Sequence, residues 1–289
     1  MPTNLVRVRV RVHGLCLASD AEGFWLPVLK AFVGVNFQVT VLTRFKKAET
    51  YDASVEVVEV DFTSVESLTT ALEGIDGLVS TVAAVAIENQ TVLIEAAVTA
   101  GMKRVVPSEC GNCTTSPKLE SLPVYDHMFK IRQYLQKNAR TGKLAWTVLA
   151  CGAFLDFLFD GPMISATSLP NIGKAITGIF KNFEAAKNKI VRASEAVLTQ
   201  NKVLAIAKEV RPYIKWEVST VQASAVLKEG LDVFSAGDFS IPVTMKILTG
   251  TAFAGDIYGG AYDETDNELL SVKELTEGDL NDLVAGKLA

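Results

Sequence analysis

The sequence predicts an α/β fold in which a doubly wound parallel sheet is followed by a smaller, mainly helical α/β part. The first observation is that strand-like and helix-like segments alternate six times over about the first 150 residues. The second is composition, because 49% of the 289 residues are hydrophobic and 21% are charged, as in a compact globular protein. Such alternation places helices on both faces of a parallel sheet, joined by right-handed crossovers.

The first half of the chain supplies the predicted sheet. Its first strand is indicated by the valines from Val6 to Val12, which alternate with Arg7, Arg9 and Arg11. Further strands are expected at residues 37–44, 55–62, 77–85, 103–109 and 144–150. Helices are expected between them at residues 26–36, 64–75, 88–101 and 124–139.

One of these helices has a readable start signal. Thr63 and Glu66 have the spacing of a capping box, in which the first side chain accepts from the backbone of the first turn. Leu68, Leu72 and Ile75 then form an apolar stripe at helical spacing. The pattern predicts a helix capped by Thr63.

The second half is expected to be more helical. Helices are predicted at residues 171–182, 199–210, 221–234 and 276–288, and short strands at residues 188–194 and 215–221. The sequence therefore divides into a doubly wound domain at residues 1–160 and a second domain at residues 161–289.

Charge and hydropathy exclude several classes of partner. A net charge of −5 and a pI near 5.3 provide no basic face for nucleic acid. No apolar run approaches the roughly 20 residues that span a bilayer, and the arginines near the N-terminus interrupt any signal-peptide core. Four cysteines are too few for a disulfide scaffold of this length, so reduced thiols and a cytoplasmic location are expected.

The first strand leads into a candidate phosphate loop. Ligands of open α/β sheets bind beyond the carboxyl ends of the strands, and glycines there let the backbone approach a pyrophosphate. Here Gly14 and Gly23 are nine residues apart, with the carboxylates Asp20 and Glu22 between them. The stretch is a weak match to a cofactor loop, and an ordinary loop remains the alternative.

Cations follow the second strand. Arg44 and Lys47 lie where the adenosine ribose of a dinucleotide would bind, and an arginine there suits the 2′-phosphate of NADP. A solvated basic turn is the equal alternative. Ser80 and Thr81 end another strand and are cofactor candidates by position, with small-residue packing as their alternative role.

Several motifs carry a family resemblance. They are "LPVLKAF", "VTVLTR", "VEVVEVDFTSVESLTTALEGIDGLVST", "AAVTAGMKRVVPSECG", "LAWTVLACGAFLDF" and "DNELL". With these motifs the chain resembles the NmrA-like, isoflavone-reductase-like family of atypical short-chain dehydrogenases, in its fungal form, from Leu26 onward. The resemblance implies a Rossmann domain that binds NADP(H) and a smaller substrate domain. It adds Pro107 and Ser108 to the cofactor candidates Gly14, Arg44, Lys47, Ser80 and Thr81.

The chain departs from the family at three places. The glycines of the family loop fall on Ser19, Glu22 and Trp25, so the loop lacks its fingerprint. The family's catalytic lysine, in a pattern like K-x-x-V-R anchored on Ile131-Arg132, falls on Met128. A longer stretch with an extra strand is missing between Pro162 and Asn171, so part of the substrate domain is expected to be incomplete.

Two neighbours of Met128 are candidates for the catalytic role of the family's lysine. Lys130 points about 200° round the helix from the lysine slot, and His127 is one residue away from that slot. Packing for Met128 and solvation for Lys130 are the stronger alternatives. Ser108 and Glu109 are expected to organise their loop by hydrogen bonds.

The pair Cys110 and Cys113 has CxxC spacing, which allows a zinc half-site, a redox pair or an ordinary loop. A zinc site needs two more ligands, so no metal is expected.

Two functions stay open. One is an NADPH-dependent reductase of a small organic, often phenolic, substrate. The other is a non-catalytic regulator that binds NADP and a protein partner.

Overall fold

A parallel sheet forms the centre of the molecule. The structure is a computed structural model that describes residues 9–13, 25–44, 52–82, 87–111, 113–155 and 164–288. Its main sheet has the strand order β3-β2-β1-β4-β5-β6-β9, and every neighbouring pair is parallel. The strands are β1 Arg9–His13, β2 Gln38–Thr43, β3 Val55–Glu59, β4 Gly77–Ser80, β5 Arg104–Val106, β6 Ala145–Ala150 and β9 Lys189–Arg192. The predicted doubly wound fold is confirmed, and β1 is a central strand between β2 and β4.

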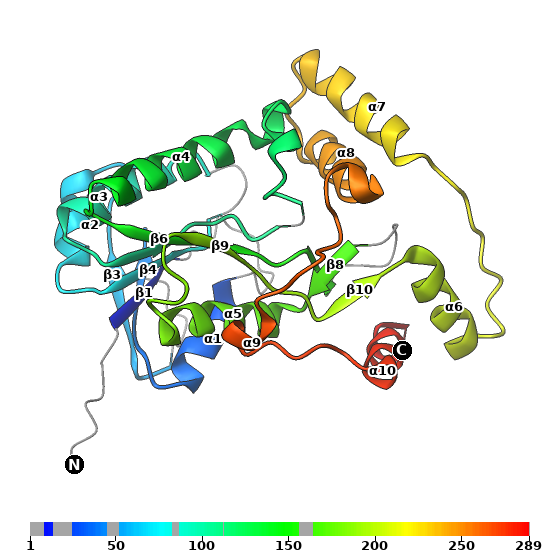
Figure 1. Ribbon diagram of the computed structural model, residues 1–289, viewed down its shortest axis with the longest axis horizontal. Coiled ribbons are helices and arrows are strands. Elements are labelled where there is room, and N and C mark those ends of the chain that lie inside the picture. The colour runs from blue at the N-terminus through cyan, green and yellow to red at the C-terminus, as the bar shows by residue number, and fades with distance from the viewer. Residues whose placement is uncertain are drawn as a thin grey trace.

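Helices cover both faces of this sheet (Figure 1). One face carries α1 Trp25–Gly34, α5 Leu169–Lys181 and α9 Asn267–Leu270, and the other carries α2 Val65–Leu72, α3 Gln90–Thr99 and α4 Asp126–Arg140. Each face has its own apolar core, because the strands of a parallel sheet present side chains to both layers. Val79 belongs to the first core, and its chain neighbour Leu78 to the second.

Two helices on the first face approach closely at a glycine. A Cβ atom on Gly173 of α5 would lie 2.7 Å from the carbonyl oxygen of Pro27 in α1. The absence of a side chain therefore lets α5 lie directly on α1. This contact fastens a helix from the second half of the chain to the sheet of the first half.

The rest of the second half forms a smaller layer beside the sheet. It contains β7 Ala153–Phe154, β8 Ile164–Thr167 and β10 Ala196–Leu198, which pair in the order β10-β8-β7. Its helices are α6 Gln200–Val210, α7 Ala223–Ser235, α8 Ile241–Ala252 and α10 Glu277–Leu288. A third apolar core joins α6 to α10, and α7 lies along α8 (Figure 1).

The boundary proposed near residue 160 stays a prediction. After it, the chain returns to the main sheet, because β9 pairs with β6 through Thr147↔Lys189 and the residues that follow. The segment from which the family's extra stretch is missing lies partly outside the described residues, and residues 164–167 of it form β8.

Two local predictions are wrong. Helix α2 is capped by Ser64, whose hydroxyl accepts from the Ser67 amide at 3.1 Å, while the Thr63 hydroxyl donates to Asp61 at 2.7 Å. The helix thus begins one residue later than the capping-box spacing indicated. Residues 215–221 form no strand, and Val218 and Val221 are exposed there. Apolar alternation was insufficient because a strand also needs a partner with which to pair its backbone.

Candidate functional site

The carboxyl ends of the parallel strands lie at one edge of the main sheet. The strand order reverses at β1, because β2 and β3 lie on one side of it and β4, β5 and β6 lie on the other. Open α/β sheets bind ligands at such a reversal. His13 at the end of β1 lies opposite both Leu42 and Ser80. Val79 in turn lies opposite Val106, which precedes Pro107. The structure therefore brings the ends of β1, β2, β4 and β5 together.

The predicted cofactor residues that the structure describes all lie at this edge. Arg44 follows β2 and is exposed to solvent. Ser80 and Thr81 end β4 and are buried, and Pro107 and Ser108 follow β5. Gly14 and Lys47 fall outside the described residues. Among the described residues, this edge offers a ligand the exposed Arg44 cation and the small buried hydroxyl groups at the end of β4.

Ser108 fastens two of these strand ends to helix α3. Its amide donates to the Gln90 side-chain carbonyl at 2.7 Å, and its hydroxyl donates to the Val82 carbonyl at 2.8 Å. Within the described residues, the Ser80 hydroxyl and the Gln90 amide nitrogen have no hydrogen-bond partner, although both residues are 2% exposed. Buried polar groups are normally paired, so each of these two atoms is a candidate for contact with a polar group of a ligand. No sequence pattern indicated Gln90, because a single glutamine in a helix has no distinctive spacing.

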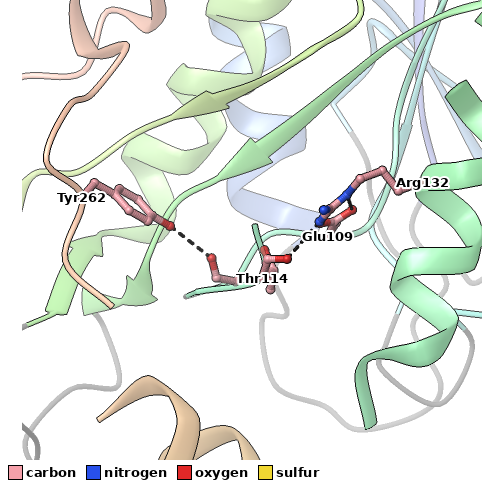
Figure 2. Close-up of polar contacts among 5 residues, drawn as sticks. Glu109, Thr114, Arg132 and Tyr262 are labelled. Carbon is pink, nitrogen blue, oxygen red and sulfur yellow. Dashed lines mark hydrogen bonds and ion pairs between the residues drawn. The ribbon is translucent and has the colours of Figure 1, made fainter. Parts of the chain in front are cut away.

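Glu109 and Arg132 form a buried ion pair (Figure 2). The Arg132 guanidinium donates to both carboxylate oxygens of Glu109, and also to the Thr114 carbonyl at 2.9 Å. Burial raises the pKa of the Glu109 carboxyl to about 7, although the positive charge of Arg132 acts in the opposite direction. The pair ties helix α4 to the loop after β5. The prediction that Ser108 and Glu109 organise this loop by hydrogen bonds is confirmed.

Tyr262 approaches the same loop from the C-terminal part of the chain (Figure 2). Its hydroxyl accepts from the Gly152 amide at 2.8 Å and lies 3.5 Å from the Gly111 carbonyl. Burial raises the pKa of Tyr262 far above its ordinary value, so the phenol stays protonated and retains a donor. Gly152 has a φ of +68°, and a Cβ atom there would lie 2.1 Å from the Ser165 carbonyl oxygen. Nothing in the sequence pattern predicted this tyrosine contact.

The three residues considered for catalysis all lie on helix α4, but their side chains have different surroundings. Met128 is half-buried and packs against an apolar cluster that contains Cys113, Leu119 and Tyr125. Lys130 is exposed and pairs with Asp126 at 2.6 Å, and His127 lies 3.5 Å from the Glu88 carboxylate on the surface. Packing as the role of Met128 is confirmed. The catalytic roles of Lys130 and His127 stay predictions.

The described residues contain neither a metal-binding cluster nor a membrane-spanning helix. In the part of the chain that the structure describes, no three His, Cys, Asp or Glu side chains are grouped to hold a metal ion. None of the described helices is long and apolar enough to cross a membrane.

Comparison with known proteins agrees with this architecture. Residues 27–167 match the model of the NmrA-like family. Oxidoreductase poxI of Penicillium oxalicum is 23% identical over 284 residues, which cover 89% of each chain. The crystal structure of isoflavone reductase has a TM-score of 0.72 at 18% identity and covers 98% of this chain and 100% of its own. The binary complex of leucoanthocyanidin reductase with NADPH from Vitis vinifera has a TM-score of 0.70 at 16% identity, over 96% of this chain and 99% of its own. The chain is thus similar to the NmrA-like family over residues 27–167, and it shares the fold of these reductase structures over almost its whole length.

Proposed function

We propose that the protein is an NADPH-dependent oxidoreductase that reduces a small organic, aromatic molecule. The observation that carries the proposal is Arg44, an exposed cation at the end of β2, next to the strand where the sheet order reverses. In dinucleotide-binding sheets the adenosine ribose lies at this position, and an arginine accommodates its 2′-phosphate. The match to the NmrA-like family and the names of the relatives, oxidoreductases and reductases, support the same function.

The described residues fit such a cofactor. Arg44 would bind the 2′-phosphate, and the unpaired Ser80 hydroxyl and Gln90 amide would meet polar groups of the ligand at the ends of β4 and β5. When bound, the dinucleotide supplies a hydride, and the protein supplies orientation and electrostatics. The stretch that would face the pyrophosphate lies outside the described residues, and its sequence contains Asp20 and Glu22.

Buried and half-buried hydrogen bonds hold the loop after β5 at the candidate site. Arg132 and Glu109 hold the loop after β5 against α4, and Ser108 joins that loop to α3. These contacts are buried or half-buried, so they fix the loop with little competition from water. Ser108 and Glu109 are therefore positioning residues in this proposal.

A second candidate function is a non-catalytic regulator that binds NADP and reports it to a protein partner. The observation in its favour is Met128, which occupies the position of the family's lysine and packs into an apolar cluster. Methionine has no proton to transfer. A cofactor that binds without turnover would be the expected behaviour of such a regulator.

Cofactor selectivity tests the proposal. The melting temperature should rise more with NADPH than with NADH, because a ligand bound only by the folded state stabilises by about 2.7 kcal/mol at 100 times its Kd. Arg44→Ala should weaken NADPH about 10- to 100-fold, which corresponds to a lost charged hydrogen bond of about 1.5–3 kcal/mol. NADH affinity should remain unchanged.

Lys143→Ala is the matched control, because Lys143 is an exposed cation that precedes β6 at the opposite edge of the sheet. It should leave both affinities unchanged. Equal binding of NADPH and NADH by the unmodified protein would contradict the role of Arg44. Oxidation of bound NADPH by quinone or phenolic acceptors then distinguishes the enzyme from the regulator.

A further inference from the structure

Two thiols lie at adjacent strand ends on the same edge of the sheet. β5 and β6 are parallel neighbours with Arg104 opposite Ala145 and Val105 opposite Trp146. Cys151 directly follows β6, and Cys110 lies in the loop beyond the end of β5. The Tyr262 hydroxyl accepts from the Gly152 amide at 2.8 Å and lies 3.5 Å from the Gly111 carbonyl, so it holds the residues next to the two cysteines close together.

The two cysteines differ in their exposure to solvent. Cys151 is fully buried in the apolar core on the α1–α5 face, and Cys110 packs against that core while remaining partly exposed. Burial raises the pKa of Cys151 well above its ordinary value, and a hydrogen bond with the Cys110 side chain acts in the same direction. Cys151 therefore rests as a neutral thiol in contact with its neighbour.

The CxxC spacing in the sequence had indicated a different pair. Cys113 is buried in another cluster, with Leu119 and Tyr125, and burial raises its pKa to about 11. The structure thus divides Cys110 from Cys113 between two cores, and it places Cys151 beside Cys110 instead.

We propose that Cys110 and Cys151 are a modification site that forms a reversible disulfide when the protein meets a hydroperoxide. Cys110 begins the reaction because it is the partly exposed member. Its sulfur attacks the peroxide, the O–O bond breaks, and Cys110 becomes a sulfenic acid while one alcohol or water molecule leaves. The Cys151 sulfur then attacks the Cys110 sulfur, the S–S bond forms, and the Cys151 proton leaves with the hydroxyl group as water. The two sulfurs together lose two electrons, which reduce the peroxide.

The disulfide would be a covalent cross-link between two segments of the candidate site. Glu109 precedes Cys110, and Gly152 follows Cys151, so the bond would join the loop held by Arg132 to the turn held by Tyr262. Dithiothreitol should reverse it by thiol exchange.

Hydrogen peroxide treatment of the full chain, followed by thiol counting after denaturation, tests the proposal. The four thiols of the reduced protein should fall to two, with a mass loss of two hydrogens and full recovery in dithiothreitol. Peptide mapping without reduction should show Cys110 linked to Cys151. The measurement needs no cofactor, so its outcome is independent of the proposed function.

Single substitutions provide the controls. Cys113→Ser should retain the cross-link, and Cys110→Ser should abolish it at a partly exposed position where folding is little affected. A link between Cys110 and Cys113, a link to Cys16, or sulfinic acid on Cys110 without a cross-link would each overturn the proposal.

Discussion

Met128 is the residue on which the proposed chemistry depends. Delivery of a hydride to a conjugated carbon leaves charge that a positioned acid must neutralise, which typically contributes 10² to 10⁴ in rate. We expect slow turnover of phenolic acceptors by the unmodified protein and a rise of at least about tenfold in Met128→Lys, measured as NADPH oxidation. The half-buried position lets a lysine stem pack where Met128 does, with its ammonium group directed to water.

Lys130→Ala is the control for that experiment, because Lys130 lies on the same helix in a surface ion pair with Asp126. It should change the rate little. If the unmodified protein turns over quickly and Lys130→Ala loses this activity, the proton transfer belongs to Lys130 instead.

Glu109 predicts a pH dependence of stability. Its pKa in the folded protein is raised to about 7 by burial, above the ordinary value of 4.5, so the unfolded chain releases the proton first. Its contribution to the free energy of unfolding is complete below about pH 4.5 and is lost as the pH rises to about 7. We expect the unmodified protein to lose on the order of 1–3 kcal/mol across this range relative to Glu109→Gln, measured by urea denaturation. If the unmodified protein instead gains stability relative to Glu109→Gln as the pH rises, Arg132 holds the pKa of the carboxyl below its ordinary value.

At the scale of an element, the start of α2 distinguishes two neighbouring hydroxyl residues. Ser64 caps the helix through the Ser67 amide, whereas Thr63 bonds the exposed Asp61 carboxylate. Ser64→Ala should lower the free energy of unfolding by about 1 kcal/mol, since it leaves a first-turn amide without its acceptor. Thr63→Ala should cost less than half as much. Equal losses in denaturant titrations would restore the capping-box assignment of Thr63.

At the scale of the whole molecule, the connection between α6 and α7 is the most open described segment. Residues 211–222 contain neither helix nor strand, and Tyr213 is 99% exposed. We expect chymotrypsin to cleave after Tyr213 before any other described aromatic residue, because cleavage requires an extended and accessible backbone. Electrophoresis and mass measurement should show a fragment ending at Tyr213, and Tyr213→Ser should remove it. An earlier cut at Tyr134, which packs on the α2–α4 core, would contradict this account.

Local pattern alone determined most of the first half of the chain. The strands β2 to β6 and the helices α1, α3 and α4 were predicted near their observed places, because apolar period and turn glycines report directly on which face is buried. The edge that holds Arg44, Ser80 and Ser108 was predictable for a related reason. Carboxyl ends of parallel strands must share one edge, whatever the details of packing.

Tertiary contact decided the rest. β9 joins the sheet through its pairing with β6, Tyr262 reaches Gly152 across the chain, and Cys110 lies against Cys151 rather than Cys113. Residues 215–221 have the pattern of a strand but no strand to pair with. Each outcome depends on a partner far away in the sequence. Periodicity reports which face of a segment is apolar, but it carries no information on which distant segment that face or backbone will meet.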